Sequence, residues 1–500
     1  MKIFSLGALA LTGFMAAVAP GAYSLTVTTG AGGLRQAVGA DTDATSLVVS
    51  GSINAVDFDF ISQEMRSLDN LDLSGATVVA YSGEATFNGR TEGAPGTLPE
   101  GALMSVKART IHLPSTLSHI GDGALADIDA TTIVIPRFVE TIGRSAFSNS
   151  RNLETVIIPA SVRSVGNGAF SGCTALRSVE IAGSLESISP SVFQGCVSLS
   201  SVVLPSELKQ IGNNAFAGCS SLDNIIFPAG LETLGERAFY GASLHSVDLS
   251  FCENLTSVAP WAFAANKNLV SVALPEGVTT IGAGAFFDDS TLALNELPST
   301  LQEIDDYALK GIGAAQTELI AGTAVERLGN YSLAGWKGVQ KFEFPPSLGY
   351  IGDCAMAGWS DLAALSAETT VRVPALGADV WSGVDQNSVV LTVPTELLNE
   401  YSSTPQWKEF KVQAGSTGKN ETAAVDASVE ARFEGLTLVL TAPQTIAGVE
   451  IFDAVGRRFT LPSAADSTGM RVDTSAWSSP VMIVRIVMAD GSAAAMKLSR

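Results

Sequence analysis

The chain has 500 residues, of which 50 are acidic and 29 basic, and its formal net charge at pH 7 is −21. This acidic balance argues against nucleic acid as a partner, because nucleic-acid binding depends on basic patches that neutralise phosphates. It also argues against passive attraction to an anionic membrane surface. The charge is typical of a secreted protein that is kept soluble by its own repulsion.

Residues 1–24 have the pattern of a secretory signal peptide. Lys2 supplies the positive end, residues 6–18 are an apolar run, and Ala22-Tyr23-Ser24 is a small-residue cleavage site, with cleavage after Ala22 as the alternative. The run is short for a transmembrane helix, and no cysteine lies near the cleavage point as in a lipoprotein. We therefore expect a secreted or cell-surface protein with no membrane insertion after signal removal.

Residues 25–104 are expected to form an N-terminal cap and a first irregular coil. Apolar spacing predicts a strand–helix–strand order between residues 46 and 75, preceded by a helical turn at 34–38. Such an order can cover the exposed end of a repeat core, although residues 25–80 do not follow the period of the repeats. Residues 82–104 are rich in Gly, Pro and Thr and are expected to be irregular.

Between residues 105 and 375 the sequence repeats every 22–24 residues. In each of eleven copies an aliphatic residue is followed five positions later by a large apolar one. The pairs are Ile120/Leu125, Ile142/Phe147, Val165/Phe170, Ile188/Phe193, Ile211/Phe216, Leu234/Phe239, Val258/Phe263, Ile281/Phe286, Ile304/Leu309, Leu328/Leu333 and Ile351/Met356. A unit of this length cannot bury its own apolar face, so stacked units must share one core.

Each copy is preceded by a short alternating run that often ends in proline, as in residues 156–159. Alternation of apolar residues predicts a strand, and proline stops it because proline has no N–H for a ladder. Equivalent strands of successive units are therefore expected to pair in parallel, with the phenylalanines as the spine of the core. The Leu292–Glu326 part is the least regular, and a longer loop is expected near residues 311–318.

Two further positions of the repeat carry small residues. Gly212 and its equivalents are expected to serve a backbone conformation that a Cβ disfavours. Cys173, Cys196 and Cys219 occupy one position in three successive units, and we expect buried fillers, with one disulfide in this ladder as the alternative. Because there is no Cys-x-x-Cys and there are only three histidines, no zinc site, catalytic cysteine or cofactor is expected.

The repeat pattern resembles the BspA-type leucine-rich repeats of bacterial surface proteins. The resemblance covers roughly residues 105–375, and the string from Val49 to Ser74 is similar to the N-terminal caps of the same family. The resemblance implies a curved solenoid with parallel strands and a role in adhesion or partner binding. The periodicity by itself predicts only the solenoid.

The pattern closes in residues 376–413. A last strand at 389–393, followed by Tyr401, Trp407 and Phe410, resembles the closing unit of BspA-type arrays. From the residues alone, these aromatics can seal the last coil, and an aromatic carbohydrate platform is the alternative. Residues 414–426 are polar and without apolar periodicity, so we expect a linker.

Residues 427–500 are expected to form a separate small β domain. Strands are predicted at 436–441, 448–453, 470–472, 481–488 and 493–498. The segment resembles the C-terminal sorting domains of type IX secretion cargo, which are small β-sandwiches, and this implies contact with the secretion machinery. It departs from that family at Pro480-Val481-Met482, where the family favours Gly-x-Tyr.

Candidate binding residues lie in the middle of the predicted strands and point away from the core. These residues are Val134, Ile157, Glu180, Val203, Ile226 and Asp248. A partly apolar exposed stripe of this kind marks an interaction site. The alternatives are that loops of the chain cover the stripe, or that β-branched residues stand there for strand propensity.

No nucleophile, base and orienting group can be assembled from the sequence, and the carboxylates are not paired at a repeated position. The acidic pairs Asp288-Asp289 and Asp305-Asp306 are expected in solvated turns, with contact to Ca²⁺ as the alternative. We therefore expect a non-catalytic binding or adhesion protein whose ligand is an extracellular protein or glycan. A structural scaffold of the envelope without a specific ligand is the alternative.

Overall fold

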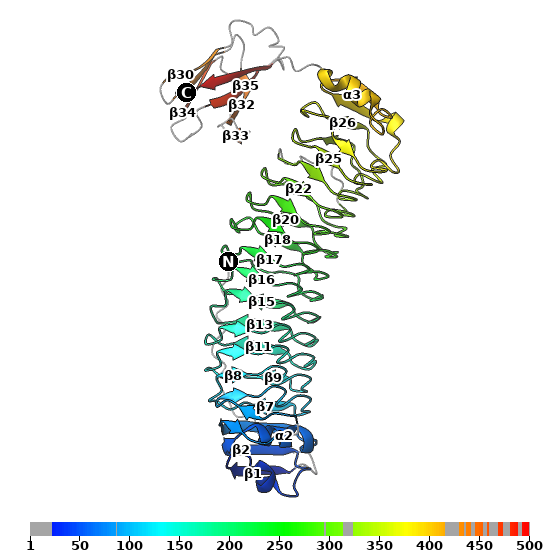
Figure 1. The fold of residues 1–500 in the computed structure, drawn as a ribbon. Coiled ribbons are helices and arrows are strands. Elements are labelled where there is room, and N and C mark those ends of the chain that lie inside the picture. The colour runs from blue at the N-terminus through cyan, green and yellow to red at the C-terminus, as the bar shows by residue number, and fades with distance from the viewer. Residues whose placement is uncertain are drawn as a thin grey trace. The chain divides into compact units, whose positions relative to one another are not determined.

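The computed structural model describes residues 23–415 apart from 87, 295–296 and 314–323, together with the strands between residues 430 and 499. Residues 1–22 of the expected signal peptide lie outside the described residues, while Ser24, its last expected residue, is in the first strand of the array. Most of the expected linker and of the loop near 311–318 also lies outside the described residues. The chain divides into two compact units, residues 1–413 and 414–500. In the first unit, coil follows coil in a stack (Figure 1).

A first parallel ladder takes one strand from successive coils. One sheet joins β1 (Ser24–Thr29), β2 (Ser46–Ile53), β3 (Asn70–Val78), β7 (Thr110–His112), β9 (Thr132–Ile133), β11 (Thr155–Ile158), β13 (Ser178–Ile181) and β15 (Ser201–Val203). Later members are β18 (Ser246–Asp248) with β20 (Ser271–Ala273), and β24 (Lys341–Glu343) with β26 (Ala364–Ser366), β28 (Val390–Val393) and β29 (Lys411–Ala414). Thr155 pairs with Ser178 and Ser178 with Ser201, so each position faces its equivalent in the next coil. The predicted parallel solenoid is confirmed.

A second parallel ladder, which the sequence did not predict, includes the aliphatic residue of each repeat pair and ends just before Gly212 and its equivalents. Its strands have two residues each: β6 (Thr97–Leu98), β8 (His119–Ile120), β10 (Thr141–Ile142), β12 (Ser164–Val165), β14 (Ser187–Ile188), β16 (Gln210–Ile211), β17 (Thr233–Leu234), β19 (Ser257–Val258), β21 (Thr280–Ile281), β22 (Glu303–Ile304), β23 (Arg327–Leu328), β25 (Tyr350–Ile351) and β27 (Ala375–Leu376). Ile188 pairs with Ile211 and Ile211 with Leu234. Most coils are therefore hydrogen-bonded to a neighbour on two walls, although the second ladder is interrupted after β12 and β17 and the first ladder after β15.

The N-terminal cap differs from expectation, because its strands keep the period of the array. Ser24 pairs with Ser46, and Ser46 pairs with Asn70, which are steps of 22 and 24 residues. The helices α1 (Leu34–Val38) and α2 (Ala55–Glu64) stand where later coils have the second strand and the Phe segment. The signature residues of the repeat are thus absent from the cap while the strand spacing persists.

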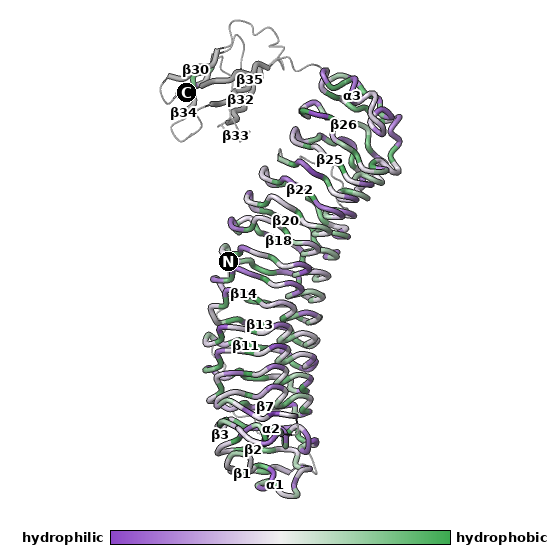
Figure 2. Tube along the Cα trace, in the orientation of Figure 1, coloured by the Kyte–Doolittle hydropathy of each residue, from purple (hydrophilic) through white to green (hydrophobic). Residues whose placement is uncertain are grey.

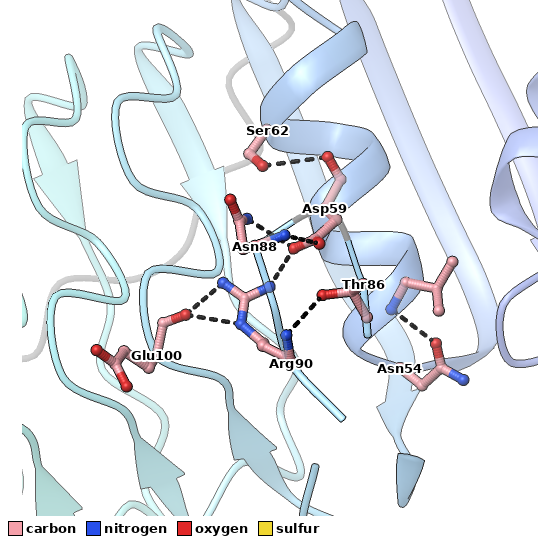
Figure 3. Close-up of polar contacts among 8 residues, drawn as sticks. Asn54, Asp59, Ser62, Thr86, Asn88, Arg90 and Glu100 are labelled. Atoms are coloured by element: carbon pink, nitrogen blue, oxygen red, sulfur yellow. Dashed lines mark hydrogen bonds and ion pairs between the residues drawn. The ribbon is translucent and has the colours of Figure 1, made fainter. Parts of the chain in front are cut away.

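A hairpin inserted after β3 is tied to the cap by a buried ion pair. The hairpin pairs β4 (Tyr81–Ser82) with β5 (Glu92–Gly93). The Asp59 carboxylate on α2 pairs with Arg90, whose Nε donates to the Glu100 carbonyl at 2.9 Å (Figure 3). Burial would raise the pKa of Asp59, but hydrogen bonds from Thr86 and Asn88 and the charge of Arg90 outweigh burial and lower it.

The predicted phenylalanine spine is present and stacked. From Phe147 to Phe286, seven rings of successive coils lie with centroids 4.9–5.7 Å apart and planes within 20° of parallel. Figure 2 shows the same alternation of apolar and polar residues returning from coil to coil. Because these rings are fully buried, each contributes roughly 1.5–3 kcal/mol of transfer free energy to the core.

The corner glycine has a role different from the one expected. Gly212 is not in the left-handed region, but a Cβ there would lie 2.6 Å from Pro190 N in the preceding coil. The equivalent Gly235 would bring a Cβ to 2.5 Å from Asn213 N. Close approach of the preceding coil therefore accounts for glycine at Gly212 and Gly235, although the requirement is not strict, since Ser189, Ala259 and Asp305 occupy the equivalent position. The left-handed residue of the repeat comes two positions later, at Asn214, with φ 57°.

The cysteine ladder holds free, buried thiols, so the disulfide alternative is wrong for the structure described. Each thiol donates to the carbonyl of the Phe in the preceding coil: Cys173 to Phe147 at 3.1 Å, Cys196 to Phe170 at 3.2 Å and Cys219 to Phe193 at 3.2 Å. Other coils use Ser150, Asn266, Trp336 and Trp359 at this position as donors to the same kind of carbonyl. The expected buried fillers are confirmed, and in these coils the filler also donates a hydrogen bond, whereas Ala242 and Ile312 fill the same position without a donor.

The array is closed by η1 (Gln386–Ser388), η2 (Thr395–Leu397) and α3 (Leu398–Ser403) before β29. Tyr401 and Trp407 are fully buried and Phe410 nearly so. The Trp407 indole N–H donates to the Pro374 carbonyl at 3.1 Å. These aromatics seal the last coil as expected, and the carbohydrate-platform alternative is wrong because no ring face is free.

The second unit contains two antiparallel sheets. One joins β30 (Glu430–Glu434), β31 (Thr437–Thr441) and β34 (Gly469–Asp473). The other joins β33 (Arg458–Phe459), β32 (Ile446–Asp453), β35 (Val481–Met488) and β36 (Ala493–Ser499). Each of the five strands predicted for this unit has a counterpart, while β30 and β33 were not predicted.

Candidate functional site

The six candidate residues take the same outward-facing position in successive coils of the array, although Val134 and Ile226 lie outside the strands of the first ladder. Register places Ile157 beside Glu180 and Glu180 beside Val203, and Asp248 pairs onward with Ala273. The apolar members are strongly exposed: 74% for Val134, 59% for Ile157, 57% for Val203 and 81% for Ile226. We call Val134, Ile157, Val203 and Ile226 the aliphatic column. No loop of the described residues covers it, so that alternative is wrong.

A row of small hydroxyl residues runs beside the aliphatic column. Thr132 pairs with Thr155, and the row continues through Ser178 and Ser201, then Ser246 and Ser271. Short side chains leave the neighbouring aliphatic groups unshielded. Each coil therefore contributes one exposed residue to an open surface, and the row does not form an enclosed pocket.

Two acidic residues interrupt and end the column. Glu180 lies between Ile157 and Val203 and is exposed. Asp248 accepts hydrogen bonds from the Ser250 hydroxyl at 2.6 Å and the Ser250 N–H at 3.0 Å, and these bonds lower its pKa. Asp248 is therefore ionised at neutral pH. The surface combines aliphatic contact area with a negative rim.

Other site chemistry is sparse in the part of the chain that the structure describes. No group of three or more His, Cys, Asp or Glu is placed there to hold a metal ion. Burial raises the pKa of the Cys196 thiol to about 12, so this thiol is protonated and unreactive at neutral pH. Within the same residues, no helix has the length and hydropathy to cross a membrane.

The acidic pairs also differ from the expected solvated turns. Arg327 contacts Glu303 at 2.6 Å and Asp305 at 3.5 Å, which forms an ion-pair cluster on one side of the array. Asp289 is fully buried and accepts the Asn266 N–H at 2.7 Å. Its other oxygen has no hydrogen-bond partner in the described structure, and burial raises the pKa of Asp289 to about 9.

Sequence reasoning missed several exposed aromatic residues. Phe251, 74% exposed, follows β18, and Phe138 lies 4.7 Å from the Arg137 guanidinium. A longer aromatic series, Trp261, Phe287, Tyr307 and Tyr331, follows the second ladder in successive coils. The signal for Trp261, Tyr307 and Tyr331 was visible as large aromatics two residues before the core position, where units before Phe239 have Gly, Ser or Asn.

The repeats match a known family. Residues 96–207 and 186–314 match the family model described as BspA type leucine-rich repeat region, six copies. The array is similar to BspA-type leucine-rich repeats. This match confirms the expected resemblance of the array, and the resemblance of residues 427–500 to sorting domains stays a prediction.

Solved structures with similar repeats come from several bacteria. A leucine-rich repeat protein from Bacteroides ovatus is 22% identical over 69% of this chain and 83% of its own, with a TM-score of 0.44. The pneumococcal vaccine antigen PcpA is 21% identical over 62% and 80%, with a TM-score of 0.41. The Treponema pallidum leucine-rich repeat protein is 32% identical over 33% and 78%, with a TM-score of 0.31. A comparison with curated proteins found no match.

Proposed function

We propose that this protein is a secreted or cell-surface binding protein, and that the aliphatic column contacts its extracellular ligand. The observation that carries the proposal is four aliphatic side chains, 57–81% exposed, at one outward-facing position of the repeat, with Ile157 and Val203 aligned by strand register through Glu180. The ligand is a protein or glycan, and the aliphatic chemistry favours a protein. The protein has no catalytic role in this proposal.

Strand propensity alone is a weaker account of the column. β-branched residues stabilise strands, but threonine has that property without exposing a large apolar surface, and it stands in the neighbouring row. Burial of one such aliphatic side chain against a ligand contributes roughly 1.5–3 kcal/mol before the costs of association. Several in line can therefore supply the core of an interface, with Glu180 and Asp248 at its polar rim.

The expected signal peptide supports an extracellular location, and the match to BspA-type repeats is consistent with it. A segment with the pattern of a secretory signal at residues 1–24 takes the array to a compartment where such a ligand is present. The C-terminal unit is proposed to contact the secretion machinery, on the resemblance of its strands to sorting domains.

The test is a variant in which Ile157, Val203 and Ile226 are all replaced by Glu. Attachment of the full chain to extracellular matrix or host cells should be lost, while the unfolding temperature stays within a few degrees of wild type. A matched control replaces Met104, Val197 and Val371 by Glu, which adds the same charge at exposed apolar positions elsewhere. Unchanged attachment of the first variant, or equal loss in the control, contradicts the proposal.

A further inference from the structure

An aromatic column runs along the later coils at a position where the backbone disfavours bulky side chains. In every coil, the residue two positions before the core Phe, Leu or Met has positive φ. The early coils have small or tolerant residues there, namely Gly123, Ser145, Gly168, Ser191 and Asn214. Later coils have Trp261, Tyr307 and Tyr331, with φ of 58°, 59° and 54°. A bulky aromatic in the left-handed region is strained, and strain of this kind concentrates at functional positions.

The rings of this column contact one another from coil to coil. Ring centroids are 5.4 Å apart for Trp261 and Phe287, 6.5 Å for Phe287 and Tyr307, and 5.1 Å for Tyr307 and Tyr331. Phe287 supplies the ring of the coil that has Gly284 at the left-handed position. A Cβ on Gly284 would lie 2.7 Å from the Trp261 indole, so this glycine makes room for the indole. We call Trp261, Phe287, Tyr307 and Tyr331 the aromatic column, and all four are partly exposed.

A polar ladder lies directly beside the aromatic column. Asp306 Oδ1 accepts the Asn330 N–H at 2.6 Å, and Asn330 Oδ1 accepts the Asp353 N–H at 2.8 Å. These residues precede Tyr307, Tyr331 and the next left-handed residue by one position. The Lys310 ammonium lies 5.2 Å from the Tyr307 ring centroid and 4.9 Å from that of Tyr331. The two coils of Tyr307 and Tyr331 thus each present one ring and one carboxylate or amide at the same spacing.

We propose that the aromatic column binds an extended, neutral polysaccharide that runs along the stacked coils. A sugar ring combines apolar C–H groups, which pack against aromatic rings, with hydroxyls, which pair with carboxylates and amides. A site that repeats from coil to coil suits a ligand that repeats along its own length. The carboxylates of Asp306 and Asp353 disfavour a polyanion.

An extended peptide fits this surface less well. Side chains on one face of a peptide recur about every 6.7 Å and differ in chemistry, whereas the column repeats one chemistry. The column also offers no unpaired strand edge to a peptide backbone, because the coils here are already hydrogen-bonded to one another, as in Tyr307 N–H to Asn330 O at 2.8 Å. The site is separate from the aliphatic column, because it follows the second ladder instead of lying on the first.

The test is electrophoresis of the full chain in native gels cast with a soluble neutral β-glucan, a galactomannan, polygalacturonate or no polymer. Wild type should be retarded by at least one neutral polymer. The double variant Tyr307→Asn, Tyr331→Asn should lose that retardation. Its unfolding temperature should be unchanged or raised, since Asn tolerates the left-handed region, as Asn214 does. Tyr240→Asn, at an exposed tyrosine outside the column, is the matched control and should stay retarded.

Absence of retardation in both neutral polymers, or retardation by polygalacturonate alone, overturns the proposal. So does a double variant that migrates like wild type. A large fall in the unfolding temperature of the double variant would show that the two rings stabilise the fold by packing. Loss of the double variant's attachment to matrix proteins would show that the column binds a protein ligand. Either result also overturns the proposal. The Ile157, Val203, Ile226→Glu variant should remain retarded, which separates failure here from failure of the proposed function.

Discussion

Asp289→Asn should stabilise the array at neutral pH. Asp289 occupies the position whose residue in other coils donates to the carbonyl of the preceding core residue, as the Asn266 amide donates to Phe239 O at 3.0 Å. Its Oδ1 accepts the Asn266 N–H, while its buried Oδ2 has no partner among the described residues. A protonated carboxyl can donate from Oδ2, as the donor position requires. An asparagine can make both interactions without a proton.

The expected magnitude follows from the pKa of Asp289. Burial raises the pKa to about 9, against about 3.9 for an unfolded Asp, so the folded chain retains a proton that the unfolded chain has lost. The contribution of Asp289 to the free energy of unfolding is fully present below the unfolded pKa. It falls by about 1.4 kcal/mol per pH unit as pH rises toward 9. At pH 7 the Asp289 carboxyl therefore lowers the free energy of unfolding by up to about 4 kcal/mol, and an asparagine at this position avoids that loss.

Urea unfolding of the full chain at pH 4, 6 and 8 measures this difference. The variant and wild type should be nearly equal at pH 4, and the variant should be progressively more stable at pH 6 and pH 8. Asp288→Asn, at the exposed neighbouring carboxylate, is the control and should show little change at any pH. A difference that does not grow with pH, or a variant less stable than wild type at pH 8, refutes the reasoning.

Three further predictions concern the core, the cap and the C-terminal unit. Phe216→Ala, between two stacked rings, should cost about 3–5 kcal/mol in urea unfolding, and a cost below about 1 kcal/mol contradicts the spine. Arg90→Met should cost about 3–5 kcal/mol by leaving Asp59 buried and unpaired, whereas Arg35→Met, at an exposed pair, should cost less than about 1 kcal/mol. In wild type, stability from Asp59 is present above the unfolded pKa of Asp and is lost as pH falls through the lowered folded pKa. Arg90→Met should reduce this acid sensitivity, while the hydrogen bonds from Thr86 and Asn88 remain. Deletion of residues 427–500 should leave the array folded by circular dichroism and abolish surface delivery, and persistent delivery contradicts the sorting role.

The architecture of the array could be predicted because large apolar residues recur at a constant spacing along the sequence. The pairs such as Ile211 and Phe216 mark where each coil enters the core, and strand alternation predicts which residues face outward. The second ladder could not be predicted, because a strand of two residues has no periodicity to detect. The period of the cap strands was not recognised in the sequence, because α1 and α2 stand in place of the signature residues of the repeat.

Other features depend on atoms in neighbouring coils. The role of Gly212 is set by Pro190 N, and the role of Cys219 by the Phe193 carbonyl, 26 residues earlier in the chain. Sequence reasoning placed the aliphatic column correctly on the outer face, since alternation determines orientation. It missed the aromatic column because a left-handed backbone position is not visible from hydropathy.

The most direct test of the central claim is hydroxyl-radical footprinting of the chain bound to the matrix or cell preparation that it attaches to. The account predicts that Ile157, Val203 and Ile226 lose reactivity on binding, while Val371, equally exposed and outside the column, keeps it. Protection of Val371 or of other surfaces with unchanged reactivity at Ile157, Val203 and Ile226 would contradict the claim that the aliphatic column binds the ligand.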